Sequence, residues 1–318
     1  MKFIFTFFLL ATFSPTSFSK GKLTVIFNHK GKKYSIGSSI NNGTYIFNKG
    51  AKKVIKIATL DWKPYIGKSL CKQGWVQQYT IAILTTLGYE IHSDFFPWAR
   101  SVSRVEKGKY DILYPEYFID KSAPSDVYKG TRRLKHLSLS KPFPGGPIAF
   151  MAKKGFEPNY NKNTKKTFFN LKNEKIGVVR GYQNTPEFDK LMDKNPPFFN
   201  ITTVNNDIQN AKILFKGRVN LIIGDPSVIK YSIKTTNKLS NSKKNKILNK
   251  IKTVQPHIKY NNLFYALSKK KKNWENLRKA INSKIQEFET EGTMYKIIEK
   301  TNKFCGFYME DTLKPYNP

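Results

Sequence analysis

Acidic residues and cysteines are scarce in this chain of 318 residues, which has 22 Asp and Glu against 56 Lys and Arg, and two cysteines. The formal net charge of +34 is typical of nucleic-acid-binding proteins. The basic residues are mostly lysines dispersed among asparagines, however, which favours a solvated surface with weak affinity for anionic polymers. We therefore expect no nucleic-acid partner, and a basic envelope protein that binds an anionic polymer stays as an alternative.

Several patterns that identify catalytic and metal sites are missing. The sequence contains no Gly-rich phosphate loop and no G-x-S-x-G motif. Its four histidines are scattered without the spacing of metal ligands. We accordingly assign no metal site, no cofactor and no catalytic residue, and we expect a protein that is not an enzyme.

Long hydrophobic runs are also rare. Lys2 precedes an apolar run at residues 3–13, and the small residues Ser17 and Ser19 follow at the spacing of a cleavage site. This pattern predicts a secretory signal peptide at residues 1–19 and a periplasmic location. The apolar run is too short to span a bilayer comfortably, and no later segment approaches the roughly 20 apolar residues of a membrane span. A helix that is retained as an anchor is the alternative to a cleaved signal peptide.

The two cysteines, Cys71 and Cys305, stand far apart in the sequence. An oxidising compartment permits a disulfide between them. Sequence alone does not establish that their Cα atoms come close enough, so the pairing stays open.

A strand, a short helix and a second strand are predicted in close order between residues 91 and 116. Pro97 suits the first turn of a helix, and Val102 and Val105 repeat at helical spacing after Trp98. Residues 110–114 read as a buried strand that Pro115 ends. Ligands on such parallel units sit at the carboxyl ends of strands and at helix starts, which is where Trp98 and Glu116 stand.

The same pattern returns later in the chain, which predicts an α/β fold with two lobes. Residues 175–179 form a second strand that leads into a loop and a helix, and residues 219–223 form a strand that ends at Asp225. The Pro- and Gly-rich segment at 138–147 indicates a crossover between lobes. We expect an N-terminal extension at 20–53, packed on the body as a hairpin or loosely held. Lobe 1 is then expected at 54–145 plus 260–318, and lobe 2 at 146–259.

Five short patterns in this order resemble the bilobal periplasmic solute-binding proteins of the polar amino-acid class, extracellular solute-binding family 3, over roughly residues 54–308. They are W-K-P-Y at 62–65, G-x-x-D at 108–111, S-x-P-F at 140–143, G-R-V-N-L-I-I-G-D at 217–225 and E-G-T at 291–293. The resemblance implies a type 2 periplasmic-binding fold with a ligand cleft between two lobes. It also implies a monomer that closes on a small-molecule ligand and presents it to an ABC-type permease in the inner membrane.

The resemblance also implies the ligand-binding residues. Aromatic clamps fall on Trp62 and Trp98, and the arginine that grips a carboxylate falls on Arg133, with Arg132 as its competitor. A loop that offers polar groups and an acid that holds an ammonium group complete the set: Tyr182, Gln183, Asn184 and Asp225. For Asp225, a plain helix N-cap is the alternative.

Glu116 departs from the family pattern, which places small hydroxyl residues there. Its carboxylate suits a ligand with extra positive charge, or an ion pair with Arg100 or Arg133. As a general acid it would also suit an enzyme on the same fold, of the cyclohexadienyl-dehydratase kind.

A solute-binding protein for an amino acid or a related carboxylate or amine is the leading hypothesis.

Overall fold

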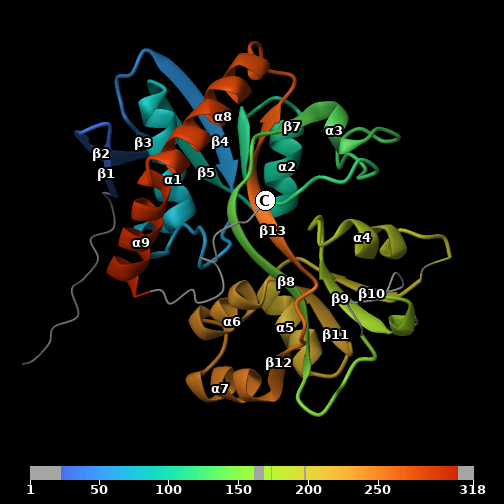
Figure 1. Ribbon diagram of the computed structural model, residues 1–318. Helices are drawn as coiled ribbons and strands as arrows, with labels where there is room; N and C mark the ends of the chain where they lie inside the picture. Colours follow the sequence, from blue (N-terminus) through green and yellow to red (C-terminus); the bar gives the residue numbers. More distant parts are fainter. Residues whose placement is uncertain (1–22, 161–167, 173, 197, 307–318) are drawn as a thin grey trace, which may run out of the picture.

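A computed structural model describes residues 23–160, 168–172, 174–196 and 198–306 (Figure 1). The predicted signal peptide at 1–19 lies outside the described residues, as does the end of predicted lobe 1 at 307–318. Within the described ranges, no helix is both long and apolar enough to cross a bilayer.

The strands of the described residues form one mixed sheet of thirteen strands in the order β1-β2-β3-β5-β4-β6-β13-β8-β11-β9-β10, with β12 paired to β8 and β7 paired to β13. Their bounds are β1 (Thr24–His29), β2 (Lys32–Asn41), β3 (Thr44–Phe47), β4 (Lys53–Thr59), β5 (Tyr89–Phe95), β6 (Ile112–Glu116), β7 (Leu137–Leu139), β8 (Phe143–Lys153), β9 (Lys175–Val179), β10 (Asn200–Val204), β11 (Leu221–Gly224), β12 (Ile251–Thr253) and β13 (Lys259–Ser268).

The helices of the described residues gather in two groups along this sheet. Figure 1 shows α1, α2, α3, α8 and α9 around β3 to β7, and α4 to α7 around β8 to β12. Their bounds are η1 (Cys71–Gln73), α1 (Trp75–Thr86), α2 (Trp98–Glu106), α3 (Arg133–His136), η2 (Phe169–Leu171), α4 (Pro186–Met192), α5 (Asp207–Phe215), α6 (Pro226–Thr235), α7 (Asn241–Lys250), α8 (Trp274–Thr290) and α9 (Thr293–Cys305).

The predicted α/β fold with two lobes is confirmed. Strands β8 and β13 pair antiparallel and run from one group of helices to the other (Figure 1). We keep the predicted bounds as the definition of lobe 1 and lobe 2. Because β8 and β13 are hydrogen-bonded to each other, the connection between the lobes is a paired ribbon rather than a single loose strand.

Strand β6 carries the predicted Glu116 and differs from the prediction at both ends. The predicted strand spans 110–114, whereas β6 spans Ile112–Glu116 and continues through Pro115. Pro115 has no N–H for a sheet, but β4 pairs with β6 only at Ile112 and Leu113. On the other side the register with β13 shifts just opposite this position. The proline therefore interrupts no ladder hydrogen bond that the sheet needs.

The segment predicted as an N-terminal extension adds three antiparallel strands to the edge of the sheet. Strand β3 pairs with β5, where Tyr45 lies opposite Ser93. Val25 and Phe27 of β1 are buried in the core of lobe 1, and β1 also contacts α1 and α9. Buried and exposed residues alternate along β1, as expected for a strand that is covered on one face.

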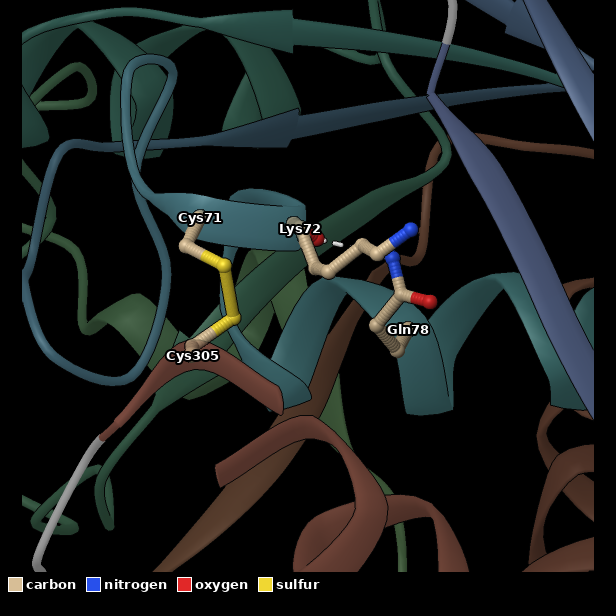
Figure 2. Close-up of a disulfide and its surroundings, with 4 residues drawn as sticks. All are labelled: Cys71, Lys72, Gln78 and Cys305. Carbon is tan, nitrogen blue, oxygen red and sulfur yellow. Dashed lines mark hydrogen bonds between the residues drawn. A yellow bond between two sulfur atoms is a disulfide. The ribbon is translucent and has the colours of Figure 1, made fainter. Parts of the chain in front are cut away.

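A disulfide between Cys71 and Cys305 joins the loop before α1 to the end of α9 (Figure 2). The two Cα atoms lie 5.7 Å apart, and 234 residues separate them in the sequence. Beside it, the side-chain amide of Gln78 donates a hydrogen bond to the backbone oxygen of Lys72 (2.7 Å). The pairing that the sequence left open is therefore formed, and it fixes the end of α9 against the rest of lobe 1.

Candidate ligand-binding site

A cavity of about 30 Å³ lies between the lobes, at the carboxyl end of β6 and the start of α2. Its lining residues come from lobe 1, from the β9–α4 loop in lobe 2 and from β13. Five of the eight predicted ligand residues line this cavity: Trp62, Trp98, Glu116, Tyr182 and Gln183. The structure thus brings together residues that are up to 121 positions apart in the sequence, from Trp62 to Gln183.

Aromatic rings form most of the lobe 1 wall. Trp62 follows β4, stacks on Tyr65 with ring centroids 4.4 Å apart, and meets the edge of Tyr117 at 5.3 Å. Trp98 opens α2, and its indole Nε1 donates a hydrogen bond to the backbone oxygen of Gly181 in lobe 2 (3.2 Å). Both indoles are almost fully buried, so the wall is apolar and keeps water out.

Glu116 is the carboxylate of the cavity and is 3% exposed. Its Oε1 accepts a hydrogen bond from the backbone N–H of Tyr117 (3.1 Å), whereas Oε2 is buried without a hydrogen-bond partner. Burial raises the pKa of Glu116 to about 7, and the positive charge of Arg133 offsets only part of this effect. The site therefore holds an under-satisfied acceptor that a donor group could pair with.

Arg133 is buried but does not line the cavity. It opens α3, and its Nη2 forms an ion pair with Oδ2 of Asp126 at 2.9 Å, while Nε and Nη1 have no hydrogen-bond partner. Its competitor Arg132 is exposed. The guanidinium thus lies close enough to act on Glu116 electrostatically, yet it is engaged by a carboxylate of the chain itself.

Asp225 also lies outside the cavity lining, and both of its oxygens are engaged. Oδ1 caps α6 by accepting hydrogen bonds from the N–H groups of Ser227 (2.7 Å) and Val228 (3.3 Å). Oδ2 accepts a hydrogen bond from the hydroxyl of Tyr65 (2.8 Å), and burial raises the pKa of Asp225 to about 7. The N-cap that the sequence offered as the alternative role of Asp225 is present.

Asn184, the remaining predicted residue, is engaged by Asp189 of lobe 2 and by Asn261 of β13. Its backbone N–H donates to Asp189 Oδ2 (2.9 Å) and its side-chain amide to Asp189 Oδ1 (3.3 Å). Its backbone oxygen accepts a hydrogen bond from the side-chain amide of Asn261 on β13 (2.8 Å). Asn184 therefore shapes the loop that carries Tyr182 and Gln183 rather than lining the cavity.

Sequence reasoning missed Tyr65, Tyr117 and Asp126. Tyr65 is the last residue of the W-K-P-Y motif, and Tyr117 directly follows Glu116, so both positions carried a local signal. Asp126 lies in the polar segment between β6 and α3 and had none.

Several hydrogen bonds between described residues join the lobes around the cavity, among them the Asn261–Asn184 bond given above. Besides the Tyr65–Asp225 and Trp98–Gly181 contacts, the backbone N–H of Asp120 lies 3.4 Å from Oε1 of Gln183. A cavity of about 30 Å³ has room for roughly two water molecules, since one water needs about 10–15 Å³. A ligand of amino-acid size therefore requires the lobes to separate and these contacts to rearrange.

Two further features lie outside this cavity. An open groove of about 880 Å³ runs along β9 and β10, and of the predicted residues only Tyr182, which also lines the cavity, borders it. Elsewhere, His29 lies between Glu287 and Glu291, and the possible ligand atoms of the three side chains lie within 4.8 Å of one another, a geometry that could hold a metal ion. Lys30 and Lys284 already form ion pairs with Glu287 (both 2.6 Å), so this group acts as a charge network that ties β1 to α8.

The family described as bacterial extracellular solute-binding proteins, family 3, matches residues 61–303, and the chain belongs to this family. No curated protein matches the sequence. Among solved structures, an ancestral arginine-binding protein bound to arginine is 20% identical with a TM-score of 0.59, covering 79% of this chain and 98% of that one. An amino-acid ABC transporter substrate-binding protein from Streptococcus pneumoniae, bound to L-arginine, is 17% identical with a TM-score of 0.57, covering 80% and 96%. A histidine kinase sensor domain is 15% identical with a TM-score of 0.60, covering 79% and 96%.

Proposed function

We propose that this protein binds a small polar solute, an amino acid or a related carboxylate or amine, between its lobes. The observation that carries the proposal is the meeting of Trp62, Trp98 and Glu116 around one interlobe cavity. Apolar walls with a few placed polar groups are the usual composition of a small-molecule site. Family membership and the arginine-bound structural neighbours support the same class of ligand.

The proposal includes a location and a partner. A signal peptide at 1–19 would direct the chain to the periplasm, where a monomer would deliver its solute to an ABC-type permease of the inner membrane. The structural neighbour from Streptococcus pneumoniae, which carries out substrate binding for such a transporter, supports this role.

Binding would proceed by hinge closure. The interlobe contacts at Tyr65 and Trp98 define a closed arrangement whose cavity is smaller than an amino acid. A solute that contacts both lobes binds the closed state better than the open one, and this difference in affinity drives closure.

A thermal-shift screen of residues 20–318 against amino acids, polyamines and small organic acids tests the proposal. A solute at 100 times its Kd stabilises the native state by about 2.7 kcal/mol, which raises the melting temperature measurably. Trp98→Leu should abolish the shift, whereas Trp274→Leu on α8, away from the cavity, should keep it. A shift that survives in Trp98→Leu would place the solute elsewhere, and the absence of any shift would overturn the proposal.

The second candidate is an enzyme that acts on a cyclic carboxylic acid in the same cavity. A buried carboxyl with a pKa raised to about 7 suits a general acid at neutral pH, which is the observation in favour of Glu116 as a catalytic group. An ancestral amino-acid-binding protein described as a precursor of cyclohexadienyl dehydratase is 20% identical, with a TM-score of 0.54. Turnover of such acids by the native protein, lost in Glu116→Gln, would favour the enzyme.

A further inference from the structure

The cavity offers a ligand one unpaired acceptor. Oε2 of Glu116 is buried, belongs to a side chain that lines the cavity, and has no hydrogen-bond partner. A buried acceptor without a donor costs free energy, and a charged N–H donor is the strongest partner for a carboxylate. The hydroxyl of Tyr117, another residue that lines the cavity, is likewise buried without a hydrogen-bond partner.

The walls around this acceptor also suit a positive charge. The rings of Trp62, Trp98 and Tyr117 all border the cavity. Aromatic rings attract ammonium and guanidinium groups at short range, and Trp does so most strongly. A carboxylate among aromatic rings is therefore a combination that favours an organic cation.

Two acidic residues of lobe 2 lie close to the cavity wall. After burial, the charges of Asp225 and Asp207 are among the causes that raise the pKa of Tyr117, so both act at the cavity wall. Asp207 accepts a hydrogen bond from the hydroxyl of Tyr182 (3.1 Å), which also lines the cavity. Among the residues that the structure describes, no Lys or Arg side chain lines it.

The arginine expected to hold a ligand's carboxylate already holds one from the chain. Asp126, from the segment between β6 and α3, pairs with Nη2 of Arg133 at 2.9 Å. A ligand carboxylate in the cavity would face Glu116 without a lining cation to neutralise it, and like charges in a buried site repel strongly.

We propose, resting on the function proposed above, that the group recognised in this cavity is an organic amine or guanidinium cation held by Glu116 and the surrounding aromatic rings, and that the ligand needs no carboxylate. Asp126 takes the place of the ligand's carboxylate on Arg133. The preferred solutes are then decarboxylated cations, such as diamines or agmatine, rather than α-amino acids.

Matched ligand pairs test this on the unaltered protein. Agmatine is arginine without its carboxylate, and cadaverine is lysine without its carboxylate. Isothermal titration of residues 20–318 should show that at least one amine of these pairs binds no more weakly than its amino acid, and that glutamate does not bind. Glu116→Gln should weaken amine binding by about tenfold or more, as loss of a charged hydrogen bond predicts. Glu275→Gln, on the exposed side of α8, should leave it unchanged.

The outcomes separate the two proposals. If arginine and lysine bind at least tenfold more tightly than both amines, or if only neutral or acidic amino acids bind, the cation inference is overturned and the proposed function stands. If no amino acid, amine or organic acid binds, both are overturned. A folded Glu116→Gln protein that keeps full affinity for the amine would remove Glu116 from the site.

Discussion

The hydroxyl of Tyr65 is the group whose removal should most directly loosen the contact between the lobes. Tyr65 lies in lobe 1 and is fully buried, and its hydroxyl donates to Oδ2 of Asp225 in lobe 2 at 2.8 Å. Tyr65→Phe keeps the ring that stacks on Trp62 and removes only this donor. The hydroxyl also lies 3.3 Å from the backbone oxygen of Gly145, so the substitution removes the interlobe hydrogen bond and this longer contact with little change in packing.

The expected magnitude follows from the charge of the acceptor. A hydrogen bond to a charged group contributes about 1.5–3 kcal/mol. Because burial raises the pKa of Asp225 to about 7, its carboxyl is partly protonated at neutral pH, and the lower end of that range applies. A loss of about 1.5 kcal/mol shifts the equilibrium between closed and open lobes roughly tenfold toward open. A solute that binds the closed state would lose affinity by up to the same factor.

Small-angle X-ray scattering without solute, together with titration of the best solute, measures both effects. Tyr65→Phe should increase the radius of gyration and weaken binding. Tyr265→Phe is the matched control, since that buried hydroxyl lies 3.0 Å from Thr80 within lobe 1. The control should lower the melting temperature without changing the radius. If Tyr65→Phe matches the native protein in radius and affinity, the Tyr65–Asp225 contact does not hold the lobes together.

Two further predictions concern stability. Replacing both Cys71 and Cys305 by Ser should lower the free energy of unfolding by about 2–5 kcal/mol, because the bond closes a long loop of the unfolded chain; an unchanged thermal unfolding curve would contradict this. Burial raises the pKa of three carboxyl groups to about 7, those of Glu116, Asp189 and Asp225. The native state therefore binds more protons than the unfolded state between about pH 4 and 7. Stability should therefore fall as pH rises through that window, giving a lower melting temperature at pH 8 than at pH 5.5. Asp189→Asn should flatten this dependence, and a melting temperature that rises with pH would refute it.

Local sequence signals were sufficient for the parts of the site that stand next to a strand or helix end. Trp98 precedes an apolar repeat that Val102 and Val105 continue, and both valines are fully buried in α2. Glu116 follows a run of apolar residues and closes β6. Because the carboxyl ends of parallel strands lie at one edge of a sheet, where the helices that follow them begin, the start of α2 after β5 and the end of β6 could be placed together before the fold was known.

The roles of Arg133 and Asp225 could not be settled in this way, because each depends on a partner that no periodicity identifies. The sequence indicates Arg133 only as a candidate for binding a carboxylate, whereas its actual partner is Asp126, in a polar segment without a repeat. Asp225 meets Tyr65 across 160 residues of sequence. Such pairings form between side chains that no local pattern links, and the sequence indicates only that each residue is able to make them.

The contrast between surface and cavity explains why the composition of this chain is a poor guide to its ligand. A formal charge of +34 argues at first for an anionic partner. Exposed charges more than about 8–10 Å apart are largely screened at physiological ionic strength, however, whereas a buried charge is screened far less. A solute inside the cavity therefore responds to Glu116 and its neighbouring carboxylates more than to the dispersed lysines. Affinity for an amine should then change little with added salt, whereas binding of an anionic polymer through the lysines would fall steeply.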